Sequence, residues 1–104
     1  MKMIQKISDM IDEELEGACD YGKAAVKYKD DHPLLAKTFY DIATQELQHM
    51  TLLHEQVVKI IEEHRKTSGE PPASMMAVYD YLHEKQIEKA NKAKSYLATY
   101  RGQS

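Results

Sequence analysis

Apolar and small residues recur at steps of three and four along most of this chain, and the pattern is interrupted at two places. Pro33 follows the stretch DDH, and Pro71 and Pro72 follow SGE. Steps of three and four are the period of an α-helix, whereas a half-buried strand alternates at every second residue. The pattern therefore predicts an all-α protein with three long helices, near residues 3–29, 33–67 and 72–100.

Each predicted helix carries one apolar stripe. The stripe positions are Ile4, Ile7, Ile11, Ala18, Tyr21 and Ala25 in the first helix, Leu35, Phe39, Ile42, Leu53, Val57 and Ile60 in the second, and Met75, Tyr79, Leu82, Ala90, Ala93 and Leu97 in the third. Long helices of this kind bury their stripes against one another. We expect a single domain, 1–104, in which the first two helices form an antiparallel hairpin, 3–67, because their connection is short. The third helix, 72–100, would be an additional C-terminal element.

The composition narrows the classes of partner. Charged residues make up 30% of the chain, hydrophobic residues 42%, and the net charge is −3. This acidic balance argues against a nucleic-acid partner. No apolar run approaches the ~20 residues of a membrane span, and the opening MKMIQKISDM lacks the apolar core of a secretory signal. The single Cys19 excludes an internal disulfide and fits a reducing compartment, so we expect a cytoplasmic protein without a membrane partner.

Two polar residues interrupt the stripe of the second helix. Glu46 and His49 lie three positions apart in the stretch IATQELQHMTLL. At about 100° per residue, Glu46 falls at the centre of the stripe around Leu53, Phe39 and Val57, and His49 falls roughly 60° away. The E-x-x-H spacing alone is close to chance in a chain with ten glutamates and five histidines. Their place on the core face is the more discriminating observation.

One acidic residue also lies on the stripe of the first helix. Among the glutamates of DEELE, Glu14 lies about 20° from the stripe centre, whereas Glu13 lies well off it and Glu16 points to the opposite side. Tyr21 follows two turns later on the same side as Glu14. The hairpin would therefore carry a second carboxylate on its core face.

A carboxylate in a protein core needs a positive partner. An unpaired one costs several kcal/mol or takes up a proton. We favour a metal site in which Glu14, Glu46 and His49 bind iron, manganese or zinc. Protonated His49 would also serve as a partner. Two interpretations without metal stay open: a buried Glu–His hydrogen bond that fixes helix register, and glutamates that remain solvated on a poorly packed stripe.

One chain supplies only half of a di-iron carboxylate site. Such a site takes a Glu from each of two helices and an E-x-x-H from each of two others. We therefore expect a homodimer or a higher even-numbered oligomer, in which two hairpins related by a twofold axis form a four-helix bundle. The third helix does not complete the set, because Asp80 lies well off its stripe, His83 lies near the edge and Gln86 is a poor iron ligand.

The remaining histidines and the cysteine are not expected to form a site. His54 lies at the margin of its stripe, His64 lies near a helix end and His32 lies in a loop. Cys19 has no His/Asp arrangement that indicates a nucleophile.

EELEGACDY followed by HPLLAKTFYDIATQELQHM resembles the ferritin-like superfamily. The resemblance is closest to half-ferritins typified by encapsulated ferritins and more distant to rubrerythrins. In that pattern one helix bears E-E-x-E with a Tyr seven residues after the second Glu. A loop with Pro follows, then a helix with E-x-x-H. Glu14, Tyr21, Glu46 and His49 match these positions, and the match covers roughly residues 10–55.

This resemblance implies a di-iron site assembled by a dimer and a ferroxidase activity that oxidises Fe(II) to Fe(III). It implies that Glu14 and Glu46 are carboxylate ligands and that His49 is a nitrogen ligand. It also implies that Tyr21 orients or tunes a ligand.

Other features limit the resemblance. Residues matching Glu13 and Glu16 belong to a peripheral metal or entry site in the encapsulated family, but here they are equally well explained as surface charge. The tail YLATYRGQS shows no evident targeting peptide, so we do not expect an encapsulating shell as a partner. A rubrerythrin-like peroxide reductase is disfavoured because no Cys₄ segment is present to deliver electrons. The alternative function is a non-catalytic helical oligomerisation protein with a polar or structural-metal core.

Overall fold

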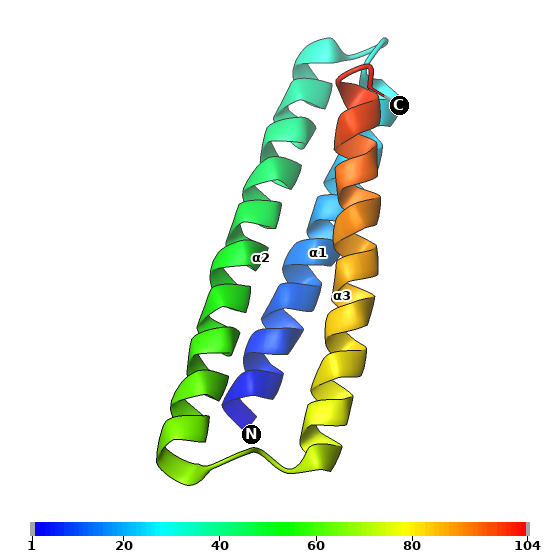
Figure 1. Ribbon diagram of the computed structural model, residues 1–104. Helices are drawn as coiled ribbons and strands as arrows, with labels where there is room; N and C mark the ends of the chain where they lie inside the picture. Colours follow the sequence, from blue (N-terminus) through cyan, green and yellow to red (C-terminus); the bar gives the residue numbers. More distant parts are fainter. Residues whose placement is uncertain (1, 104) are drawn as a thin grey trace.

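The computed structural model describes residues 2–103, which form three α-helices and no strand (Figure 1). The helices are α1 (Lys2–Tyr28), α2 (Pro33–Ser68) and α3 (Ala73–Tyr100). This confirms the all-α prediction, and the predicted helix ends agree to within one residue. The ends of the predicted domain, Met1 and Ser104, lie outside the described residues.

The two connections form where the sequence cannot continue a helix. Pro33 is the first residue of α2, a position where its missing N–H costs nothing. Before it, the backbone N–H of His32 donates to the Tyr28 carbonyl at 2.9 Å. At the other end of α2, Gly69 adopts a φ of 82°, which only glycine takes up without strain. Pro71 then prevents the helix from resuming.

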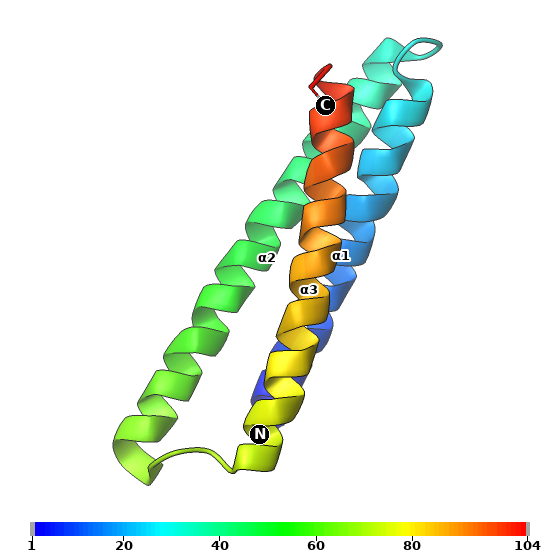
Figure 2. The ribbon, with the colours of Figure 1, turned by 45° about the vertical axis from the view of Figure 1, so that its right-hand side comes forward.

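The central helix is α1. It packs along both α2 and α3, whereas α2 and α3 contact each other little. Figures 1 and 2 show α2 and α3 diverging towards the segment that connects them. The molecule measures 55 × 19 × 18 Å, and its length is that of the 36-residue α2 at about 1.5 Å per residue.

The core is narrow and is built from few large side chains. Ile11, Leu15 and Val57 are the largest that are fully buried. Burial of each contributes about 1.5–3 kcal/mol. Alanines fill the points of closest helix approach, and the fully enclosed ones are Ala18, Ala25, Ala36, Ala43 and Ala93.

Polar contacts fix α3 against one side of α1. The Gln86 side-chain amide donates to the Ser8 hydroxyl at 2.9 Å and to an Asp12 carboxylate oxygen at 3.2 Å. Farther along, the Cys19 thiol donates to the Lys89 carbonyl at 3.4 Å. Gln86 is 7% exposed, and its amide stabilises the packing of α3 on α1.

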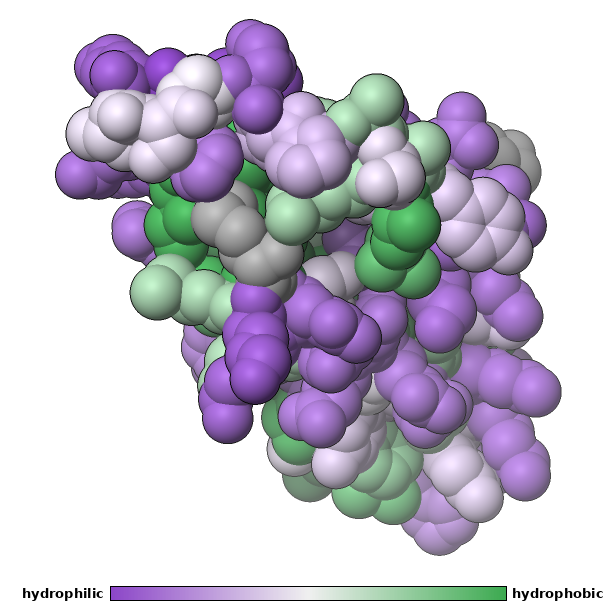
Figure 3. Space-filling model, turned by 90° about the horizontal axis from the view of Figure 1, so that it is seen from below, coloured by the Kyte–Doolittle hydropathy of each residue, from purple (hydrophilic) through white to green (hydrophobic). Residues whose placement is uncertain are grey.

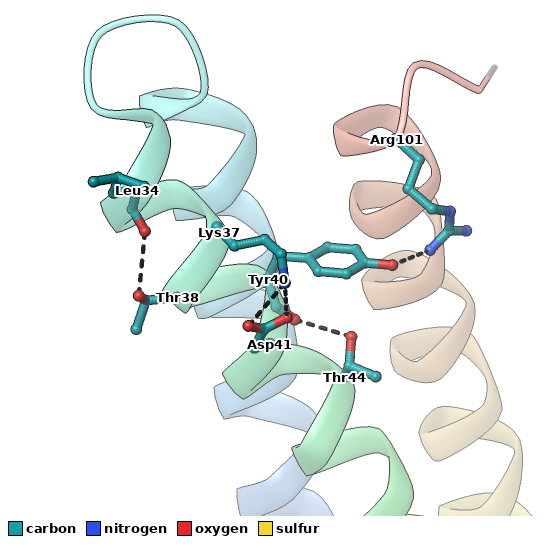
Figure 4. Close-up of polar contacts among 7 residues, drawn as sticks. All are labelled: Leu34, Lys37, Thr38, Tyr40, Asp41, Thr44 and Arg101. Atoms are coloured by element: carbon teal, nitrogen blue, oxygen red, sulfur yellow. Dashed lines mark hydrogen bonds and ion pairs between the residues drawn. The ribbon is translucent and has the colours of Figure 1, made fainter.

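A second contact joins the end of α3 to the start of α2. Arg101 donates to the Tyr40 hydroxyl at 2.9 Å, as Figure 4 shows. The Tyr40 and Tyr100 rings stack with centroids 4.7 Å apart. On the same turn of α2, Lys37 pairs with Asp41 at 2.8 Å. The contacts of Arg101 and Tyr100 with Tyr40 hold α3 near α2 at this end, where the two helices are closest.

The stripe predicted for the second helix is not the buried face of α2 in this chain. Of its six positions only Val57 is buried, and Leu35 is 45% exposed. The buried positions of α2 are Ala36, Ala43, Val57 and Ile61. The difference arises because α3 covers only one side of the α1–α2 hairpin, so the apolar residues on the other side stay partly open.

Apolar surface is therefore common outside the core. Among residues 2–103, no helix has the length and hydrophobicity to cross a membrane. Viewed from the end that carries the α2–α3 connection, hydrophobic surface lies in separate areas between hydrophilic ones (Figure 3). The large exposed apolar residues are Met3, Met10, Leu34, Leu35, Leu52, Val58, Val78, Tyr81 and Ile87.

Candidate metal centre

The antiparallel packing of α1 and α2 places His49 beside Glu14 and the Glu46 carboxylate against Gly17. The His49 Nδ1 atom lies 3.4 Å from Glu14 Oε2, an ion pair when the imidazole is protonated. Glu46 lies one turn before His49 on α2, and Glu14 is among the charges that act on it. That these three residues act together as a site stays a prediction.

The Glu46 carboxylate lies directly against the backbone of α1 at Gly17. A Cβ atom on residue 17 would overlap with that carboxylate, so only glycine leaves room for it there. The Glu46 Oε2 atom is enclosed and has no hydrogen-bond partner among the described residues. A buried acceptor without a partner lowers the stability of the folded chain. A proton or a cation bound to Glu46 would remove this penalty.

The surroundings of Glu46 disfavour the negatively charged form of its side chain. Burial raises the pKa of Glu46 above its usual value, and the neighbouring Glu14 and Asp20 carboxylates add to the rise. His49 opposes it. Like charges and desolvation both disfavour the ionised form, so a bound cation would stabilise Glu46 as a carboxylate.

The prediction that His49 lies on the core face is wrong for the single chain. The His49 side chain is 58% exposed and that of Glu14 is 29% exposed. The helical wheel placed His49 on a face shared with core residues, but α3 covers the opposite side of the hairpin. The site therefore lies at the surface of this chain, with Glu46 as its enclosed end.

Tyr21 lies one turn after Gly17 on α1 and packs against Phe39, with ring centroids 5.8 Å apart. Within residues 2–103, its hydroxyl makes no hydrogen bond to Glu14, Glu46 or His49. Tyr28 contacts the other side of this aromatic pair, with its centroid 6.2 Å from that of Phe39. The three rings form an aromatic cluster between α1 and α2. The outlying Glu13 and Glu16 are exposed, as ordinary surface charges are.

Among the described residues, no three His, Cys, Asp or Glu side chains are grouped so that they could hold a metal ion. The donor types present, two carboxylates and an imidazole, are those that iron, manganese and zinc accept. The Oε2 atom of Glu46 has no partner, and its carboxylate lies against Gly17. Both observations fit a cation bound to Glu46, with further ligands supplied from outside the chain.

The site lies on a surface that we call the α1–α2 face. It consists of two series at alternating steps of three and four, Met3, Ile7, Met10, Glu14, Gly17, Tyr21, Ala24 and Tyr28 on α1, and Leu35, Phe39, Ile42, Glu46, His49, Leu53, Gln56 and Ile60 on α2. None of these residues is fully buried. On α1 the series lies roughly 100° around the helix from the buried residues such as Leu15. The contacts to α3 through Ser8, Asp12 and Cys19 are on another side.

Sequence reasoning missed two features. The first is the role of Gly17, although a glycine inside a helical pattern often indicates a close approach. The second is a stack of rings between α2 and α3. The His54 and His83 rings are parallel with centroids 4.7 Å apart, and Tyr79 stacks on His83 at 5.8 Å. His54 and His83 were expected to be boundary residues, and both are half-buried.

The chain was compared with protein-family models, with curated proteins and with solved structures, and none of the three comparisons found a significant match.

Proposed function

We propose that two copies of this chain associate through the α1–α2 face and bind a pair of iron ions, which the protein oxidises from Fe(II) to Fe(III). Each copy would contribute Glu14, Glu46 and His49. Two hairpins would form a four-helix bundle of the ferritin-like kind, with α3 on the outside.

The observation that carries this proposal is the enclosed, unpartnered Oε2 atom of the Glu46 carboxylate. It lies on Gly17, next to Glu14 and Asp20, in a place that disfavours negative charge. A folded chain that keeps a carboxylate there gains stability when a cation binds. Because His49 and Glu14 remain partly exposed, they are accessible to a metal and to ligands from a second copy.

The spacing of the α1–α2 face supports the dimer. Apolar residues at alternating steps of three and four are the pattern by which helices pack nearly parallel in bundles. In the single chain, Met10 is 41% exposed and Leu35 is 45% exposed on this face. A second hairpin placed there would remove both from water.

Charge balance supports a pair of divalent ions. Two copies would bring together four glutamates and two neutral histidines. Two divalent ions carry an equal and opposite charge, so the assembled centre would be neutral inside the bundle. When bound, the iron pair would supply the electrons for reduction of oxygen or peroxide.

The residues of the chain would share the remaining tasks. Glu14 and Glu46 would hold the ions through carboxylate oxygens, and His49 would add a nitrogen ligand. Tyr21, in contact with Phe39, would close the centre on the side towards the α1–α2 loop and keep water away from it.

The test is an anaerobic Fe(II) titration of the purified protein, with its mass measured in solution. We expect a dimer that binds two irons, and oxidation of Fe(II) on admission of air that is faster than in buffer. Glu46→Gln and Glu14→Gln should abolish high-affinity binding while the helical content is unchanged. Glu13→Gln, at the exposed neighbour of Glu14, is the matched control and should bind normally. A protein that binds no iron, or that binds it equally in all variants, would contradict the proposal.

The Glu14–His49 ion pair favours a second candidate function. At 3.4 Å the pair can fix the register of α1 against α2 without metal, as in a non-catalytic oligomerisation protein. In that case Glu46→Gln would preserve the dimer and make it more stable. The iron titration of the wild-type protein would then show no binding.

A further inference from the structure

Two hollows lie in line between α2 and α3. The first is lined from α2 by residues between Met50 and His54, and the second by residues between Val58 and Arg65. The second hollow lies at the end where α2 and α3 diverge in Figures 1 and 2. Together the two hollows form one groove, which we call the α2–α3 groove, between residues 50–65 of α2 and residues 76–94 of α3.

The α2–α3 groove is separate from the α1–α2 face. Val58 lines the groove, and Ile60, two positions later, belongs to the α1–α2 face. The two residues lie roughly 160° apart around α2. A dimer formed through the α1–α2 face would therefore leave the groove open.

The groove is apolar and only partly covered. Val58 lines it from α2 and is 38% exposed, and Ile87 lines it from α3 and is 46% exposed. The hollows have volumes of about 210 and 160 Å³, and a space of about 150 Å³ accepts a benzene ring. Each hollow can therefore take one large apolar side chain of a partner.

The spacing of the hollows matches one face of an α-helix. The middle positions of their linings are about ten residues apart on α2 and about eleven on α3, or about 15–16 Å of helix rise. Residues eleven positions apart on a helix differ by only about 20° in direction. A helix laid along the groove would thus direct two side chains eleven positions apart into the two hollows.

The free faces of this chain do not supply such a helix. Among residues 2–103, the large exposed apolar residues outside the α1–α2 face are Leu34, Leu52, Val58, Val78, Tyr81 and Ile87. No two of them are ten or eleven positions apart. The α1–α2 face itself is two helices wide, so it does not enter a groove as a single helix does. The pattern therefore favours a helix from another protein over a second copy of this chain.

Charged residues at the two ends of the groove favour one direction of that helix. Lys94 lines the first hollow and Glu62 lines the second, and neither takes part in an ion pair within residues 2–103. Arg65, also beside Glu62 in the lining, is already paired with Glu70 at 3.1 Å. An acidic residue is favourable in the first turn of a helix and a basic residue in the last turn. A helix with its N-terminus near Lys94 satisfies both preferences and would run antiparallel to α3.

We propose that the α2–α3 groove binds an amphipathic helix of a partner protein. The helix has large apolar side chains eleven positions apart, an acidic first turn beside Lys94 and a basic last turn beside Glu62. Binding would add a fourth helix to the three of this chain by the helix-in-groove mode. This interaction goes beyond the proposed metal function and does not depend on it.

The experiment measures binding of a labelled synthetic peptide to the full-length protein by fluorescence anisotropy. The peptide has about 18 residues, enough to span the groove, with two phenylalanines eleven positions apart, glutamates in the first turn and lysines in the last. We expect saturable binding with a dissociation constant in roughly the micromolar range. A control peptide of the same composition has the second phenylalanine moved by two positions, which places it on the opposite side of the helix. It should bind at least about tenfold more weakly.

Two substitutions on α3 locate the binding surface. Ile87→Lys places a charge in the groove and should weaken binding of the peptide at least about tenfold. Val78→Lys is the matched control, because Val78 is 60% exposed and lies roughly 180° around α3 from Ile87. It should change binding less than about twofold. Both native side chains are exposed, so both variants should fold.

A charge exchange tests the direction of the helix. Lys94→Glu should weaken binding of the peptide by about two- to fivefold and should improve binding of a second peptide with lysines in its first turn. Lys92→Glu, at an exposed position outside the groove, should do neither. The helicity of each free peptide cancels, because each peptide is compared across protein variants.

Three results would overturn the proposal. One is the absence of saturable binding, and another is equal binding of the two peptides that differ in phenylalanine position. The third is a lower mass in solution of the Ile87→Lys protein alone, which would show that a second copy occupies the groove.

Discussion

The carboxylate of Glu46 occupies the space in which a side chain on residue 17 would begin. Gly17 lies in the interior of α1, where glycine weakens a helix by about 1 kcal/mol relative to alanine. The chain therefore accepts a weaker helix at the place where α2 brings the Glu46 carboxylate against α1.

Gly17→Ala should separate helix stability from metal binding. The methyl group would displace the Glu46 carboxylate from its position against residue 17. We therefore expect iron affinity to fall by about 10- to 100-fold. Thermal unfolding of the metal-free protein should occur at an unchanged or higher temperature, because alanine favours the helix. Both quantities can be measured on one preparation by titration and circular dichroism.

The two residues should not act additively. In a Glu46→Gln background, Gly17→Ala should cause no further loss of iron affinity, because the ligand that it displaces is already absent. Additive losses would show that Gly17 affects the site by another route.

Met10→Lys should disrupt the proposed dimer. Met10 lies on the α1–α2 face and is 41% exposed, so a lysine there leaves the single chain folded but places a charge in the interface. We expect the dimer dissociation constant to rise at least about tenfold, as measured by sedimentation. Leu52→Lys is the control, because Leu52 is 60% exposed and lies off that face. Equal effects of the two substitutions would argue against an interface at the α1–α2 face.

The fold should lose stability in mild acid through His54. Burial and His83 lower the pKa of His54 in the folded chain, while Glu55 opposes the change. The folded state then binds fewer protons than the unfolded state, so this contribution is present above the usual histidine pKa and is lost as pH falls through the lowered one. Urea midpoints of metal-free protein should decrease between pH 7.5 and 5.5, and less so in His54→Phe. His32→Gln, at an exposed loop position, should retain the full decrease.

Gln86→Leu should loosen α3 from α1. The substitution leaves the Ser8 hydroxyl, in a residue only 5% exposed, without its donor and removes a partner of Asp12. We expect a loss of about 1–3 kcal/mol in the free energy of unfolding, measured with urea. Gln48→Leu, at an exposed position of α2, should change it by less than about 0.5 kcal/mol.

Much of the fold could be predicted because the helical signals in the chain agree with one another. The period of three and four, Pro33 at the start of α2, and Gly69 with Pro71 after its end all indicate the same boundaries. Which helix packs against which was harder to predict from the sequence. Nothing in the stripes shows that α1 would pack along both α2 and α3, because that depends on which side of the hairpin α3 covers.

The candidate site was predictable only as a neighbourhood. A helical wheel places Glu14 and Glu46 on facing sides, but it does not show which of those sides becomes interior. Consequently His49 was expected in the core and is 58% exposed. The His54–His83 stack could not be found from the wheel of either helix, because it depends on the distance between α2 and α3.

Because α1 holds both other helices, the covalent link between α2 and α3 contributes little to their arrangement. Residues 69–72 connect the two helices outside any helix, and α2 and α3 contact each other little. We therefore expect the protein to tolerate a backbone cut at Gly69, after which a peptide of residues 70–104 would rebind the hairpin through Gln86 and Lys89. The chain would then work as a two-fragment complementation system, in which recovery of helicity on mixing reports the docking of α3 alone.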